Sequence, residues 1–100
     1  MKAIAVAAHD VAPSHRESDE NYHGIVTHLN DRWRVVLCQA GIQWILQYRA
    51  SSKSARRIEW RGRSYCHTRQ ALIRDARYHA GEISPYAMAV MRQLPERIAA

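Results

Sequence analysis

The 100-residue sequence contains no phenylalanine, only two cysteines and no long hydrophobic run. Without phenylalanine, the aromatic volume of a core must come from three tryptophans and five tyrosines, which also serve at interfaces because each carries a polar group. Cys38 and Cys66 form no CxxC pair, which argues against a disulfide framework and favours a reducing compartment. The apolar residues 3–8 are too few for an export signal or a membrane span. We therefore expect a cytoplasmic protein with no membrane contact.

Catalytic and metal-binding motifs are also missing. There is no GxSxG, P-loop or GxGxxG pattern, and the six histidines are scattered. Cys66 and His67 are adjacent, so on a strand they would point to opposite faces and could not pair as nucleophile and base. A zinc site would have to combine Cys38, Cys66, His67 and His28 without the usual C-x₂₋₄-C pair. We therefore predict no enzyme activity, no catalytic residue, no metal and no cofactor, and interpret both cysteines as small apolar core residues.

Charge is distributed unevenly along the chain. Residues 1–31 carry five acidic against two basic side chains, a net charge of −3. Residues 32–79 carry eleven basic against two acidic side chains, a net charge of +9, and the remainder is neutral. This asymmetry favours a polyanionic partner, meaning nucleic acid, an acidic protein surface or a nucleoprotein. A basic face that is merely solvated is the alternative that charge alone leaves open.

Alternating polarity predicts antiparallel strands in the runs 24–30, 32–39 and 42–49, with turns between them. The alternation is clearest in the third run, where one face is apolar and the other mostly polar and partly basic. The apolar face would carry Ile42, Trp44, Leu46 and Tyr48, and the opposite face Gln43, Ile45, Gln47 and Arg49. We expect the second of these faces to be exposed to solvent.

A serine-rich basic loop, residues 50–57, is expected to lead to a fourth strand that begins near Arg57 and extends to Cys66 if Gly62 allows a bend. A helix is then predicted from Thr68, a good N-cap residue, to a stop at Gly81. A second helix is predicted to begin at Ser84 and Pro85, which suit the N-cap and first helical positions.

The predicted fold class is α+β, with a three- or four-stranded antiparallel sheet packed against one or two C-terminal helices. Residues 9–23 are polar and rich in turn formers, so residues 1–23 are predicted to form a flexible acidic N-terminal segment. Residues 24–100 would then form a single α+β domain.

Arginine dominates the predicted binding surface, since thirteen of the fifteen basic residues are arginine. Its planar fork suits bidentate hydrogen bonding to phosphate or carboxylate and stacking on bases. The candidate nucleic-acid or partner-binding residues are Arg34, Gln43, Gln47, Arg49, Lys53, Arg56, Arg57, Arg61, Arg63, Arg69, Arg74 and Arg77.

The stretch IEWRGRSYCHTRQALIR, residues 58–74, illustrates how core and binding residues are interleaved. Its apolar members are expected to close the core where the last strand turns into the helix, and Gly62 to permit the bend. These core members are Ile58, Trp60, Tyr65, Leu72 and Ile73. The arginines between them are not explained by core formation.

Together with WRVVLCQAGIQWILQYR and LPERI, this stretch resembles a family of small uncharacterised proteins from alphaproteobacterial genomes and their prophages, over about residues 30–98. The order of strands, followed by a helix that starts T-x-x-A-L, is also similar in topology to the arm-type domain of phage integrases and to the plant AP2 domain. In those modules a three-stranded sheet lies in the DNA major groove. The similarity implies that Arg34, Gln43, Gln47 and Arg49 occupy corresponding positions on the sheet.

The leading hypothesis is a small, non-enzymatic basic domain that binds nucleic acid or a nucleoprotein complex. The alternative is a phage- or mobile-element-encoded, anti-CRISPR-like inhibitor that blocks a host nucleic-acid-targeting defence complex, with Trp and Arg side chains as interface anchors. A toxin- or antitoxin-type partner protein is a third option. The identity of the partner and the number of copies, including a homodimer, stay open.

Overall fold

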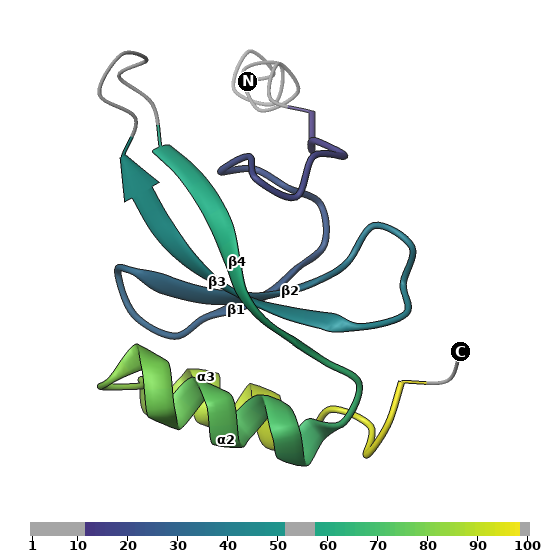
Figure 1. The fold of residues 1–100 in the computed structure, drawn as a ribbon, viewed down its shortest axis with the longest axis vertical. Helices are drawn as coiled ribbons and strands as arrows, with labels where there is room; N and C mark the ends of the chain where they lie inside the picture. The colour runs from purple at the N-terminus through teal and green to yellow at the C-terminus, as the bar shows by residue number, and fades with distance from the viewer. Residues whose placement is uncertain (1–11, 52–57, 99–100) are drawn as a thin grey trace, which may run out of the picture.

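Four antiparallel strands and two helices make up the fold (Figure 1). The computed structural model describes residues 12–51 and 58–98. The strands are β1 (Ile25–His28), β2 (Trp33–Leu37), β3 (Trp44–Ser51) and β4 (Ile58–Cys66), paired in chain order so that β1 and β4 are the edges. The helices α2 (Arg69–Ala80) and α3 (Pro85–Arg92) follow. This architecture confirms the predicted α+β fold with a four-stranded sheet and two C-terminal helices.

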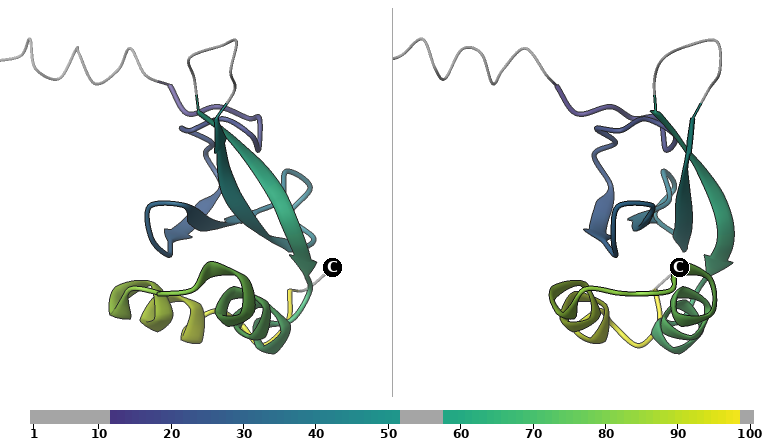
Figure 2. Two further views of the ribbon diagram at one scale, coloured as in Figure 1. Left: turned by 60° about the vertical axis from the view of Figure 1, so that its left-hand side comes forward. Right: turned by 90° about the vertical axis from the view of Figure 1, so that its left-hand side faces the viewer.

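Both helices lie on the same side of the sheet, α2 beside β4 and α3 beside β1 (Figure 2). Trp44 and Leu46 of β3 point towards them and pack in the main core with Leu72 of α2 and Met91 of α3. Burying a large apolar side chain of this kind contributes about 1.5–3 kcal/mol. The predicted apolar face of the third run is therefore the face that the helices cover.

The helix boundaries agree with their capping residues. The Thr68 hydroxyl accepts a hydrogen bond from the Ala71 N–H at 3.1 Å, and the Ser84 hydroxyl does the same for a residue in the first turn of α3. Gly81 ends α2 with a φ of 75°, a conformation that glycine adopts at little cost. Neither helix in the part of the chain that the structure describes has the length and apolar run needed to cross a lipid bilayer.

The opposite face of the sheet is covered by residues 14–22, which we call the strap. Tyr22 packs in a second apolar cluster with Val36 and Ile45, and its hydroxyl donates to the Leu37 carbonyl at 2.7 Å. The strap therefore packs on the sheet instead of forming a flexible segment. Of the predicted solvent face of β3, Ile45 and Gln47 are buried beneath it, whereas Arg49 is exposed. Residues 1–11 lie outside the described ranges.

A bulge interrupts β4 near its middle. Leu46 pairs with Ser64 but its neighbour Gln47 pairs with Gly62, so Arg63 is the extra residue. The bend predicted at Gly62 is therefore a bulge. Because of the extra residue, Tyr65 faces the strap side of the sheet, where it is 57% exposed, and its predicted place in the core is wrong.

Candidate nucleic-acid interface

Arg34 lies at the centre of the fold with 0% of its surface exposed. Its Nε donates to Gln47 Oε1 at 2.7 Å, its Nη1 to the Glu20 carbonyl at 3.1 Å, and its Nη2 to the carbonyls of Glu17 and Asp19 at 3.0 and 2.9 Å. Gln47 is also buried, and its Nε2 donates to the Glu17 carbonyl at 2.9 Å. The predicted contact of these two residues with nucleic acid is therefore corrected, because their side chains hold the strap on the sheet.

An aromatic ring completes the surroundings of Arg34. The guanidinium carbon lies 4.3 Å from the centroid of the Trp60 ring, a cation–π contact. Burial lowers the pKa of Arg34 to about 10, while the charges of Glu20 and Asp19 act in the opposite direction. The guanidinium stays charged at neutral pH, stabilised by three carbonyl dipoles and the ring.

The acidic side chains of the strap have partners of their own. Glu17 accepts from the Gln39 N–H at 2.7 Å, and Asp19 accepts from the Ser14 hydroxyl at 2.7 Å. Glu20 accepts from the indole N–H of Trp60. Each of these three carboxylates is thus engaged by a donor within the protein.

Several other predicted binding residues are dispersed. Gln43 is half-buried just before β3, and Arg49 is exposed on β3. Arg69 is half-buried, and its Nη1 donates to the Leu94 carbonyl at 2.9 Å, which ties the start of α2 to the segment after α3. Three further candidates fall outside the described ranges: Lys53, Arg56 and Arg57.

The four remaining candidates are exposed on two neighbouring elements, and we call them the basic flank. Arg61 and Arg63 lie on the edge strand β4, and Arg74 and Arg77 lie on α2. Figure 2 shows β4 and α2 together on one side of the fold, with β1 and α3 on the other. The four arginines thus lie on the β4–α2 side of the fold.

Only part of this positive charge is neutralised within the protein. Arg61 Nη2 lies 3.6 Å from Glu59 Oε1, and Arg74 Nε lies 3.1 Å from Asp75 Oδ1. The other two arginines of the basic flank form no ion pair with any residue in the ranges 12–51 and 58–98. Exposed ion pairs contribute little to stability, so all four side chains can exchange partners at low cost.

A groove of about 560 Å³ follows the outer surface of α2. It is lined by Gln70, Ile73, Arg74, Arg77 and Tyr78, residues that repeat at helical spacing and so share one side of α2. Tyr78 is 83% exposed, and an exposed tyrosine between arginines is typical of a binding surface. The groove therefore brings together two guanidinium groups, the amide of Gln70 and the ring of Tyr78.

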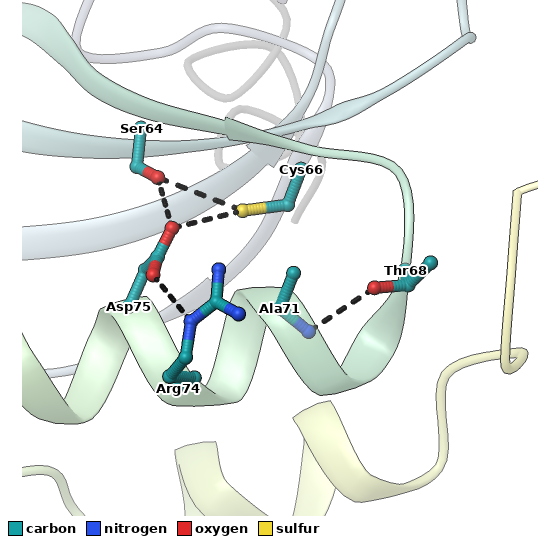
Figure 3. A network of polar contacts seen from close by, with 6 residues as sticks. All are labelled: Ser64, Cys66, Thr68, Ala71, Arg74 and Asp75. Carbon is teal, nitrogen blue, oxygen red and sulfur yellow. Dashed lines mark hydrogen bonds and ion pairs between the residues drawn. The ribbon is translucent and has the colours of Figure 1, made fainter.

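Asp75 of α2 contacts Ser64 and Cys66 of β4 (Figure 3). The Ser64 hydroxyl donates to Asp75 Oδ2, and the Cys66 thiol donates to the same oxygen at 3.5 Å. Arg74 Nε donates to the other carboxylate oxygen at 3.1 Å. The hydrogen bond from Ser64 is the main cause that lowers the pKa of Asp75. The carboxylate therefore stays charged, ties α2 to β4 and pairs with Arg74.

Asp75→Asn is expected to lower the free energy of unfolding by about 1 kcal/mol near neutral pH, because it removes charge-assisted hydrogen bonds to Ser64 and Arg74. The folded-state pKa of Asp75 is below its ordinary value of 3.8, so the contribution is present above that value and is lost as pH falls through the folded pKa. Urea unfolding should show that the difference in unfolding free energy between the variant and wild type shrinks as the pH falls through this range. The exposed Asp31→Asn is the control, and a difference that stays constant with pH would contradict the assignment.

The cysteines offer no reactive centre. Cys38 and Cys66 are free and buried, which confirms their predicted place in the core. Burial raises the pKa of the Cys66 thiol, so the sulfur stays protonated, and the neighbouring His67 is exposed. Within the described residues, no three His, Cys, Asp or Glu side chains come together as metal ligands.

Two exposed tyrosines and the strap were missed by sequence reasoning. Tyr65 follows the flank arginines of β4, and Tyr78 follows those of α2, so an aromatic residue lies close to basic residues in both elements. That interleaving was the available signal. For the strap, the signal was an arginine in the middle of the apolar stretch of β2, which needs buried acceptors.

Comparison with protein-family models, curated proteins and solved structures finds no match to the chain. The resemblance to small prophage proteins and the topological similarity to AP2-like domains stay predictions. What the chain can bind follows from its own side chains.

Proposed function

We propose that the protein is a small, non-enzymatic nucleic-acid-binding domain that contacts phosphates through the basic flank. The observation that carries this proposal is the incomplete pairing of four exposed arginines on two adjacent elements. Arginines held close together repel one another unless a counter-charge binds them. A phosphate backbone supplies negative charges in a row, and each guanidinium can bind a phosphate with two parallel hydrogen bonds.

Protection of the sheet edge explains only half of the basic flank. Charged side chains on an edge strand discourage pairing with another chain, so Arg61 and Arg63 on β4 have a role without any ligand. Arg74 and Arg77 lie on α2, where no such protection is needed. The helix residues therefore favour a ligand.

The mode of binding differs from insertion of a sheet face into the major groove. The polar sheet face lies beneath the strap, and the opposite face is covered by the helices. The edge strand β4 and the outer side of α2 stay accessible. Both present arginines to phosphate and few groups to base edges. Contacts of this kind position a protein on nucleic acid with little sequence preference.

The inhibitor hypothesis draws support from one feature, the groove on α2. Ile73 and Tyr78 add apolar and aromatic surface between its arginines, a combination that also suits an acidic protein surface. An anti-CRISPR-like protein that binds a defence complex would use the same arginines. The two candidate functions therefore differ in ligand and not in site.

Matched double variants test the proposal. Arg63→Gln with Arg77→Gln removes two unpaired charges of the basic flank, and Arg32→Gln with Arg92→Gln removes two exposed charges elsewhere. We expect the first variant to weaken binding of labelled DNA and RNA at least about tenfold at low salt. The slope of the logarithm of the binding constant against the logarithm of the salt concentration should fall by about one to two, because one to two phosphate contacts are lost. The second variant should behave nearly as wild type.

Fluorescence anisotropy between about 50 and 200 mM salt provides the measurement. Absence of binding to single- and double-stranded DNA and RNA at the lowest salt would overturn the proposal. Equal losses in the two double variants would show that net charge alone is responsible. Binding of polyglutamate as tight as binding of nucleic acid would favour the inhibitor hypothesis.

A further inference from the structure

A cleft of about 320 Å³ opens between the strap and β4. Arg16 and Ser18 line it from the strap, and Trp60, Gly62 and Tyr65 line it from β4. Trp60 is buried and forms the floor, while Arg16 and Tyr65 are exposed. The cleft thus has an aromatic ring on one wall and a guanidinium on the other.

Hydrogen bonds hold the strap wall of the cleft in place. The Ser18 carbonyl accepts from the Trp60 N–H at 2.9 Å, which fixes the strap against the edge of β4. Arg16 is held by its backbone, since its N–H donates to the Ser14 hydroxyl at 2.9 Å and its carbonyl accepts from the Asp19 N–H at 3.0 Å. The Arg16 side chain is therefore presented from an anchored turn.

On the other wall, Tyr65 rests against the backbone of Gly62. A Cβ atom at position 62 would lie 2.8 Å from Cζ of the tyrosine and 3.3 Å from Cγ2 of Ile45, so a larger residue would displace the ring. The bulge places Tyr65 on this side of the sheet, where it is more than half exposed. The ring keeps one exposed surface towards the cleft.

The cleft carries one acidic group, Glu17, whose orientation matters for an anionic ligand. Its carboxylate accepts from the Gln39 N–H at 2.7 Å, in the turn between β2 and β3. Gln47, at the floor, is likewise occupied by Arg34 and by the Glu17 carbonyl. The polar and aromatic groups left without a partner in the described residues are thus the Arg16 guanidinium, the Ser18 hydroxyl and the Tyr65 ring and hydroxyl.

We propose that this cleft binds an unpaired nucleobase of a single-stranded nucleic acid, stacked on Tyr65, with Arg16 contacting the adjoining phosphate. The inference rests on the proposed function and names its substrate class. An aromatic side chain beside arginines is the usual platform for single strands, because every base has a face that can stack. A base inside a duplex is already paired and stacked, so it cannot enter a cleft of this kind.

The test compares Tyr65→Ala, Tyr65→Phe and the exposed control Tyr86→Ala on α3. The ligands are a pyrimidine oligonucleotide of about 8 nucleotides, the same strand with one abasic site at each position in turn, a duplex and a mononucleotide. We expect Tyr65→Ala to weaken single-strand binding roughly tenfold with duplex binding unchanged, and the other two variants to bind as wild type. Abasic substitution at one position should weaken wild type by a similar factor and leave Tyr65→Ala unaffected.

A second variant, Gly62→Ala, should reproduce the loss by displacing the ring while circular dichroism shows a folded protein. Full single-strand affinity in Tyr65→Ala, together with a loss in Arg63→Gln with Arg77→Gln, would overturn the cleft and leave the proposed function standing. A mononucleotide that binds as tightly as the oligonucleotide would overturn the assignment to a strand. Absence of any nucleic-acid binding in wild type would overturn the proposed function itself.

Discussion

Replacing Arg34 by alanine is expected to lower the free energy of unfolding by roughly 3–5 kcal/mol. The substitution leaves Gln47 Oε1 and the carbonyls of Glu17, Asp19 and Glu20 without their donor. Buried acceptors that lose a charged donor bear the full cost of desolvation. The loss is a large part of the 5–15 kcal/mol that stabilises a typical domain.

Urea unfolding measures this loss, and limited proteolysis within residues 14–22 reports whether the strap has been released. Arg34→Lys should also destabilise, because an ammonium lacks the planar fork that reaches several acceptors at once. Arg32→Ala, an exposed arginine just before the same strand, is the control and should change stability by less than about 0.5 kcal/mol. Wild-type stability in Arg34→Ala would show that the strap contributes little to the fold.

The same variant separates a structural from a base-reading role. If Arg34 read bases, its removal would reduce nucleic-acid binding and leave stability intact. Because the side chain is completely buried, we expect Arg34→Ala to lose stability, and any loss of nucleic-acid binding to follow from that loss.

Trp44→Ala is expected to cost about 3–5 kcal/mol of unfolding free energy. Trp44 is 3% exposed and packs in the main core between the sheet and the helices, with Leu46 and Cys66 among its cluster. Removing the indole leaves a cavity that the neighbouring strands and helices cannot fill without moving.

The control for this variant is Ile42→Ala, since Ile42 shares the predicted apolar face of the third run but is 46% exposed. Thermal unfolding should show a large fall in Tm for Trp44→Ala and a small one for Ile42→Ala. A folded, equally stable Trp44→Ala protein would be incompatible with the core described above.

The helices and the pairing of the strands could be predicted because their signals are local. Thr68, Ser84 and Pro85 cap helices through atoms within one turn, and alternation along β3 is visible in consecutive residues. What covers each face is decided by residues far away in sequence. Gln47 and Arg34 look like surface residues until the strap supplies their acceptors.

The strap itself was hidden by its composition. Its polarity is typical of a flexible linker, but its contacts to Arg34 are made by backbone carbonyls, which every sequence possesses. Side-chain composition therefore carried no sign of the interaction. The negative charge of Asp19 and Glu20 acts on the guanidinium at longer range.

The candidate site could be predicted only as the set of residues that the core does not use. The arginines at 61, 63, 69 and 74 were left over once the core was assigned. The structure exposes all of them except Arg69, which is half-buried against the Leu94 carbonyl. Tyr65 was misassigned because a single extra residue in β4 reverses the side to which later residues point. The cleft beside Tyr65 could not be predicted, because one of its walls is formed by the strap.

The outer edge of β4 has a second consequence, for self-association. An open edge presents unpaired backbone groups to which a strand of another copy can add. Here Ser18 occupies the Trp60 N–H, the bulge at Arg63 interrupts the ladder, and Arg61 would meet like charges on a second copy. The charges proposed to attract nucleic acid would thus also oppose pairing of two copies through β4. A bound polyanion would cancel these charges, and several copies could then bind next to one another along one strand.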